Sequence, residues 1–177
     1  MYKTKIRQII ASTILLCALA PQSRQIAQEA PAVSLLTLPC VNSGIGNWAS
    51  QTENISVGRA LYQSMMYMGS GDELSSLTCR LQPNERNLNF QTLNLEFGMR
   101  DNDKSSPPVE VNLYIDGVKA NSQKVSSGEK ASISIDVTTT KNIALEAVCS
   151  EEDKYCSRVY FWDASLQVAS PLPEENN

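Results

Sequence analysis

Apolar and polar residues alternate along much of the second half of the chain. The alternation is regular over residues 93–99, 109–115 and 133–137, where every second residue is apolar. A period of two is that of a β-strand with one buried side and one solvent-facing side. Turn-forming pairs such as Asp116-Gly117 and Ser127-Gly128 separate these runs. The pattern predicts about eight or nine antiparallel strands that form a sandwich or barrel.

The N-terminal segment differs from the rest of the chain. Lys3, Lys5 and Arg7 precede an uncharged, mostly apolar run over residues 9–20, an order typical of a secretory signal peptide. That run is shorter than the roughly 20 apolar residues that span a bilayer. We therefore expect residues 1–32 to be a signal peptide with a short polar spacer, residues 33–168 to be one folded domain, and residues 169–177 to be a flexible tail. The chain would then be secreted or periplasmic, with no membrane span after cleavage.

Charge narrows the choice of partners. Loss of the three basic residues of the signal leaves 12 basic and 19 acidic side chains, a net charge of −7. A negative surface repels phosphate backbones and anionic lipids. Nucleic acid and membrane surfaces are therefore not expected as partners.

The chain contains no histidine. Its absence excludes catalysis by an imidazole base and zinc binding by imidazole ligands. Two carboxylates could still hydrolyse a glycoside, but no spacing among the acidic residues singles out such a pair. We therefore predict that the protein is not an enzyme.

Five cysteines become four if Cys17 is removed with the signal, and an even number in an exported chain favours disulfides. Four cysteines allow three pairings. Cys149 and Cys156 flank a short polar loop, so we expect them to pair with each other and Cys40 to pair with Cys79. The alternative is four free thiols.

Six segments of the chain, in this order, resemble a known family: residues 55–62, Phe97-Gly98-Met99-Arg100-Asp101, residues 109–117, 135–137 and 143–145, and Trp162-Asp163-Ala164. Together they are similar to the NPCBM family of carbohydrate-binding modules over roughly residues 35–168. The resemblance implies a galactose-binding-like jelly roll of two antiparallel sheets, usually appended to glycoside hydrolases or other surface enzymes. It also implies that the protein is a non-catalytic module for a cell-envelope or extracellular glycan.

Two departures from the family pattern support an alternative function. Met65-Met66-Tyr67-Met68 stands where the family commonly has a histidine, and Ser157-Arg158 stands near the place of a second one. The alternative is an envelope module for protein–protein interaction or structure that kept the jelly roll and lost its sugar site. The Met-rich segment itself could be a partner-binding surface or, as we prefer, a strand or turn that covers the open edge of the sandwich.

Sugar binding requires flat aromatic faces and planar polar groups, which sandwich modules usually place in loops at one end of the sheets. We expect Trp48, Tyr155, Arg158 and Trp162, with Asp163 as an acceptor, to assemble near the loop at residues 150–155. Trp162 could instead lie in the core if a bulge interrupts the last strand, and Trp48 could serve either role.

Two acidic runs are candidates for a structural calcium ion. Asp101-Asn102-Asp103 and Glu151-Glu152-Asp153 offer the oxygen ligands that calcium prefers. Neither run has the spacing of a recognised calcium loop, and acidic turn residues are mostly solvated. No other cofactor is expected.

Overall fold

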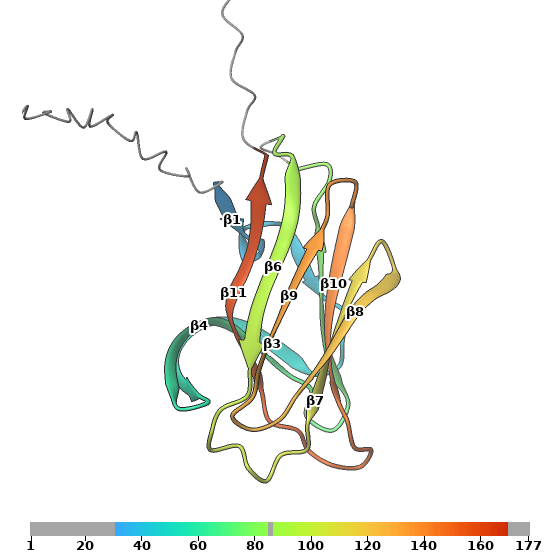
Figure 1. The fold of residues 1–177 in the computed structure, drawn as a ribbon. Helices are drawn as coiled ribbons and strands as arrows, with labels where there is room; N and C mark the ends of the chain where they lie inside the picture. Colours follow the sequence, from blue (N-terminus) through green and yellow to red (C-terminus); the bar gives the residue numbers. More distant parts are fainter. Residues whose placement is uncertain (1–30, 85–86, 170–177) are drawn as a thin grey trace, which may run out of the picture.

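The computed structural model describes residues 31–84 and 87–169, which form a sandwich of two antiparallel sheets (Figure 1). The strand order is β3-β4-β11-β6-β9 in the first sheet, where β1 also pairs with β11, and β2-β5-β10-β7-β8 in the second. A 3-10 turn, η1 (Leu35–Thr37), follows β1. The strands are β1 (Ala32–Ser34), β2 (Cys40–Asn42), β3 (Asn47–Val57), β4 (Ala60–Gly69), β5 (Leu74–Arg80), β6 (Phe90–Gly98), β7 (Val109–Ile115), β8 (Val118–Val125), β9 (Lys130–Asp136), β10 (Asn142–Cys149) and β11 (Val159–Val168).

This architecture confirms the predicted all-β, jelly-roll type of sandwich. The predicted signal peptide and tail lie almost wholly outside the described residues and stay predictions. In the part of the chain that the structure describes, no helix is long and apolar enough to cross a membrane.

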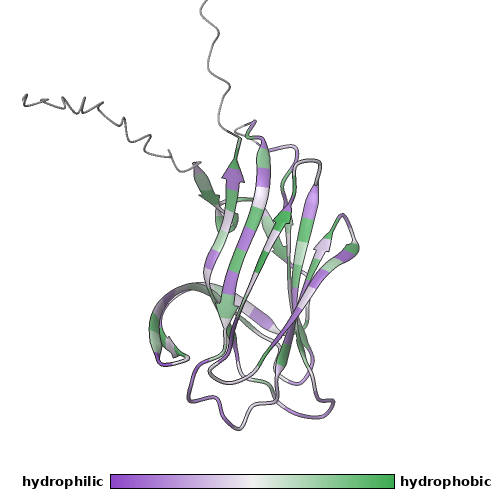
Figure 2. Ribbon diagram, viewed as in Figure 1, coloured by the Kyte–Doolittle hydropathy of each residue, from purple (hydrophilic) through white to green (hydrophobic). Residues whose placement is uncertain are grey.

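The main core lies between the two sheets and is built by the period-two pattern. Leu93, Leu95 and Phe97 of β6 are at most 1% exposed, and alternate residues of β10 on the facing sheet are equally buried. Apolar bands along β6 alternate with polar ones (Figure 2). Each strand therefore contributes one apolar side to the core, as the sequence predicted.

The Met-rich segment is β4, and its methionines are core residues. Met66 and Met68 are completely buried. The interpretation as a strand is confirmed, but its expected position at the open edge is wrong, because β4 lies between β3 and β11. The edge strand beside β4 is β3, which begins in a polar loop and therefore has a weaker pattern in the sequence.

The hairpin of β3 and β4 curls beside the sandwich (Figure 1). A register shift between Ser50 and Glu53 interrupts the pairing of the two strands. Bulges of this kind bend a strand and increase its twist. Beyond the bend, Ile55 and Val57 pack on Tyr160 of β11 and form a second, smaller core on the outer face of the first sheet.

Both predicted disulfides are present. Cys40 on β2 is bonded to Cys79 on β5, and Cys149 at the end of β10 is bonded to Cys156. The pairing from sequence is therefore confirmed, and the alternative of four free thiols is wrong. The second bridge closes the loop that leads into β11.

Candidate functional site

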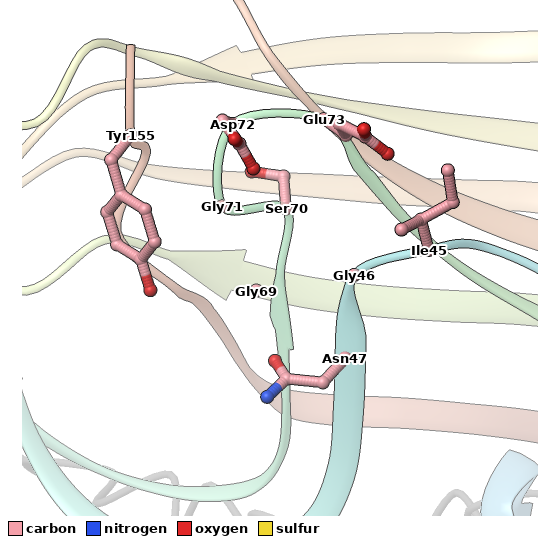
Figure 3. Close-up of a pocket in the computed structure, with 9 residues that line it drawn as sticks. All are labelled: Ile45, Gly46, Asn47, Gly69, Ser70, Gly71, Asp72, Glu73 and Tyr155. Atoms are coloured by element: carbon pink, nitrogen blue, oxygen red, sulfur yellow. The ribbon is translucent and has the colours of Figure 1, made fainter.

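An open groove of about 290 Å³ lies where the loop after β4 meets the loop before β11 (Figure 3). The first loop carries Ser70, Gly71 and Asp72, and Tyr155 stands on the side of it opposite to Ile45 (Figure 3). The groove is lined by Ile45, Gly46, Asn47, Gly69, Ser70, Gly71, Asp72, Glu73 and Tyr155.

The floor of the groove is made of glycine backbone. A Cβ atom on Gly46 would lie 2.5 Å from the carbonyl oxygen of Gly69, and one on Gly69 would lie 2.7 Å from the Oδ1 atom of Asn47. Gly71 has a φ of +64°, a conformation that glycine adopts without strain. Gly46 and Gly69 therefore allow the start of β3, the end of β4 and the start of β5 to lie closer together than side chains would permit.

Tyr155 provides the exposed aromatic ring of the groove. It is 76% exposed, and a Cβ atom added to Gly71 would lie 3.6 Å from its ring. The next residue, Cys156, donates its backbone N–H to the carbonyl oxygen of Gly71 at 2.7 Å and is held by the disulfide to Cys149. The ring is therefore exposed while its backbone is fixed at the edge of the groove.

Polar groups surround this ring. The side chains of Asn47, Asp72 and Glu73 are exposed and offer an amide and two carboxylates. Ser70 is only 2% exposed, and its hydroxyl has no hydrogen-bond partner among the described residues. A buried hydroxyl without a partner is uncommon, because its desolvation is not compensated, and those of Ser150 and Tyr160 are in the same state.

Arg158 extends the groove onto the outer face of the first sheet. Its guanidinium carbon lies 3.9 Å from the ring centre of Tyr67, a cation–π contact. Its Cγ would lie 3.5 Å from a Cβ atom on Gly69. Arg158 therefore borders the groove floor, with its guanidinium fixed on an aromatic face.

A scan against protein-family models finds no match, and neither does a search of curated proteins. Among solved structures, the CBM51 of Clostridium perfringens GH95 in complex with methyl-galactose matches with 13% identity and a TM-score of 0.62, covering 77% of this chain and 100% of that one. The CBM51-2 and INT domains of C. perfringens ZmpB in complex with GlcNAc match with 13% identity and a TM-score of 0.62, covering 78% of this chain and 32% of that one. The tandem CBM51 modules of Sp3GH98 from Streptococcus pneumoniae SP3-BS71 match with 11% identity and a TM-score of 0.53, covering 78% and 50%.

The chain has the fold of the CBM51 carbohydrate-binding modules. This fold agrees with the resemblance to a family of carbohydrate-binding modules found in the sequence analysis. The chain corresponds to the whole of the GH95 module and to about a third of the ZmpB structure.

Two of the five predicted site residues lie at the groove, and the other three do not. Tyr155 lines the groove, and Arg158 borders it. Trp48 follows the groove residue Asn47 on β3, but its half-buried ring packs against the main core. Trp162 and Asp163 follow Arg158 by four and five residues, a distance of about 13 Å or more along an extended strand.

Trp162 lies at a bulge in β11, but the bulge does not turn it into the main core, as the sequence had suggested that a bulge would. The pairing with β6 slips between Phe161 and Asp163. Trp162 belongs to the smaller outer core, where it stacks on Tyr62 with ring centres 4.2 Å apart, and its Nε1 donates to Glu96 Oε2 at 2.7 Å. The indole is therefore half-buried and engaged by protein partners on one face and one edge.

The acidic runs do not gather into a metal site in the described residues. The carboxylate of Asp101 accepts hydrogen bonds from the Ser56 hydroxyl and from the backbone N–H groups of Gly58 and Arg59. Asp103 pairs with Arg100 at 3.2 Å. These partners give both carboxylates another role, and the structural calcium stays a prediction.

Four polar groove residues were not singled out from the sequence: Asn47, Ser70, Asp72 and Glu73. The available signal was a pair of glycine-containing loops, residues 42–47 and 69–72. One precedes β3 and the other follows β4, so both lie at the open end of this hairpin. Because paired strands bring such loops together, two glycine loops separated by two strands point to a shared backbone-lined surface.

Proposed function

We propose that the protein is an exported, non-catalytic module that binds a glycan in the groove around Tyr155. The observation that carries the proposal is an exposed tyrosine ring, fixed by a disulfide-closed loop, beside the exposed polar side chains of Asn47, Asp72 and Glu73. The CBM51 fold supports it, because the matching structures are carbohydrate-binding modules.

The groove offers the two kinds of contact that a sugar ring requires. The flat face of Tyr155 can pack against the C–H face of a pyranose, and the polar side chains of Asn47, Asp72 and Glu73 can bond its hydroxyls. The groove is open, so the expected dissociation constants are micromolar to millimolar.

Two further features support the cell-surface setting. Two disulfides are typical of a domain that folds in an oxidising compartment. The structures that share the fold hold methyl-galactose and GlcNAc, so a neutral hexose and an N-acetylhexosamine are the first ligands to test.

The proposal is tested with a glycan array, followed by titration of the oxidised, exported chain with each sugar that binds. Tyr155→Ala is expected to weaken binding about tenfold, because one stacking ring contributes about 1 kcal/mol or more. Tyr155→Phe keeps the ring and should keep most of the affinity. Val118→Ala is the matched control, since Val118 is 72% exposed on β8 and does not line the groove.

Binding that persists in a folded Tyr155→Ala variant would move the site away from this groove. If the wild-type protein binds no glycan on the array, the function itself is refuted, and an envelope protein becomes the partner to seek by crosslinking. Release of reducing sugar from a bound glycan would refute the non-catalytic part of the proposal.

A further inference from the structure

A second hollow, of about 480 Å³, lies where three loops of the sandwich meet. The loops are the turn between β3 and β4, the connection from β6 to β7, and the turn between β8 and β9. Its polar lining consists of Arg59, Asp101, Lys104, Ser106, Ser126 and Ser127. Its volume falls in the range of about 300–1,000 Å³ that is usual for small-molecule sites.

Asp101 joins the hairpin turn to the neighbouring loop. Its carboxylate accepts the N–H of Gly58 at 2.8 Å, the N–H of Arg59 at 3.1 Å, and the hydroxyl of Ser56. The Ser56 bond is the largest cause that lowers the pKa of Asp101, so this group is ionised and occupied by three donors. It therefore acts as a clamp on the turn and has little acceptor capacity left for a ligand.

Arg59 has a backbone conformation that is unfavourable for its residue type. Its φ is +66° and follows a φ of +59° at Gly58, which together make a two-residue hairpin turn. Such turns favour glycine or asparagine, because a Cβ atom clashes with the backbone in this region. A strained residue held by specific bonds is a reason to look for a function of its side chain.

The two cations of the hollow are free to meet an anion. Arg59 and Lys104 are exposed, and within the described residues no carboxylate lies within 4.0 Å of the guanidinium nitrogens of Arg59 or the Nζ atom of Lys104. Asp101 bonds the backbone N–H of Arg59 instead. Arg100, by contrast, is paired with Glu53 and Asp103. The hollow therefore presents a guanidinium and an ammonium group to solvent, beside serine hydroxyls.

We propose that this hollow binds the anionic group of an acidic saccharide, either a carboxylate or a sulfate ester. The guanidinium of Arg59 can bond two oxygens of such a group at once, and Lys104 adds a second positive charge. The anionic group follows from these residues alone, whereas the saccharide that carries it rests on the function proposed above.

The hollow and the groove are distinct, but two consecutive residues contact one of them each. Cys156 donates its N–H to Gly71 in the groove at 2.7 Å, and Ser157 donates its N–H to the Ser106 hydroxyl at the hollow at 2.8 Å. The groove carries the carboxylates of Asp72 and Glu73 and no cation in its lining, whereas the hollow carries two cations beside the carboxylate of Asp101, which three donors occupy. The two sites therefore select saccharide units of different charge.

The test titrates the oxidised, exported chain with three probes and follows binding by NMR. The probes are digalacturonate for a carboxylate, galactose 6-sulfate for a sulfate ester, and neutral galactobiose. We expect at least one anionic probe to bind in the hollow, with an affinity that falls severalfold between low and physiological salt. Arg59→Gly is the decisive variant, because glycine accepts a positive φ without strain. Arg59→Gly should lower the affinity for the anionic probe about tenfold, while the melting temperature stays equal to that of the wild type or rises.

Lys104→Ala should also lower the affinity for the anionic probe. Lys124→Ala should not, because Lys124 is an exposed lysine on β8 outside the hollow. The proposal is overturned if neither anionic probe binds, or if binding survives both Arg59→Gly and Lys104→Ala. It is also overturned if Tyr155→Ala abolishes binding of the anionic probe, since the anion would then lie in the groove. Anionic binding that persists when no neutral glycan binds would refute only the function proposed for the groove.

Discussion

The two disulfides offer a test in which stability and binding should respond in opposite order. One bridge would be removed by Cys149→Ala with Cys156→Ala, and the other by Cys40→Ala with Cys79→Ala. The bridges close loops with sequence separations of 7 and 39 residues. In the chain-entropy relation, removal of the short bridge costs about 2.5 kcal/mol and removal of the long one about 3.9 kcal/mol at 25 °C.

Glycan binding should follow position rather than loop length. The short bridge fixes the loop that carries Tyr155 at the groove, so its loss lets the ring leave its place and adds an ordering penalty to binding. The long bridge joins β2 to β5, and neither of its cysteines lines the groove. The less destabilised variant is therefore the one that should lose affinity, by about tenfold.

The assay is urea unfolding of each variant, followed by titration with the bound glycan at a temperature where both variants are folded. Equal slopes of the unfolding curves would show that the comparison is between similar unfolded states. Equal affinities in the two variants would refute the role of the short bridge in positioning Tyr155. A larger stability loss for the short bridge would refute the loop-length reasoning.

Three further predictions concern the remaining parts of the fold. Trp162→Ala should lower the free energy of unfolding by about 2 kcal/mol, because a stacked, half-buried ring is lost, and should leave glycan affinity within about twofold in titrations. Gly46→Ala should destabilise by about 1–3 kcal/mol in urea unfolding, because its Cβ meets backbone oxygen at 2.5 Å, whereas Gly69→Ala meets only a flexible amide and should chiefly weaken binding. The pKa of Asp101 is lower in the folded chain than in the unfolded chain, so its carboxylate stabilises the fold above about pH 4. This stabilisation is lost as the pH falls, because the unfolded chain binds a proton at Asp101 before the folded chain does. Asp101→Asn should therefore be less stable than the wild type at pH 7 and lose less stability on acidification. If the free energies of unfolding of the two proteins fall in parallel as the pH is lowered, this reasoning is wrong.

The strands that the sequence predicted are those with one buried side. Residues 93–99 and 143–147 alternate strictly, and the structure places their apolar members in the core. The strand β8 (Val118–Val125) was missed, because it is an edge strand and all but its last residue are at least partly exposed. A strand that buries neither side has no period to detect, and only its hairpin with β7 defines it.

The groove could be predicted only in part. Tyr155 stood out because a polar loop between two cysteines gives an aromatic residue no core to enter. Asn47 and Ser70 could not be placed, since their proximity depends on the pairing of Asn47 with Gly69 at the ends of β3 and β4. Register between strands is a long-range property, and alternation within one strand does not determine it.

Trp162 shows why an aromatic residue on a strand is harder to assign than one in a closed loop. Without a bulge, the alternation that buries Phe161 would point Trp162 outward and Asp163 into the core. The slip between Phe161 and Asp163 inserts one extra residue, so that Ala164 rather than Asp163 returns to the core. The hairpin of β3 and β4 then covers the outward-facing indole with Tyr62. Both events depend on neighbouring strands, so the role of Trp162 follows from the packing of the sheet, whereas that of Tyr155 follows from its own loop.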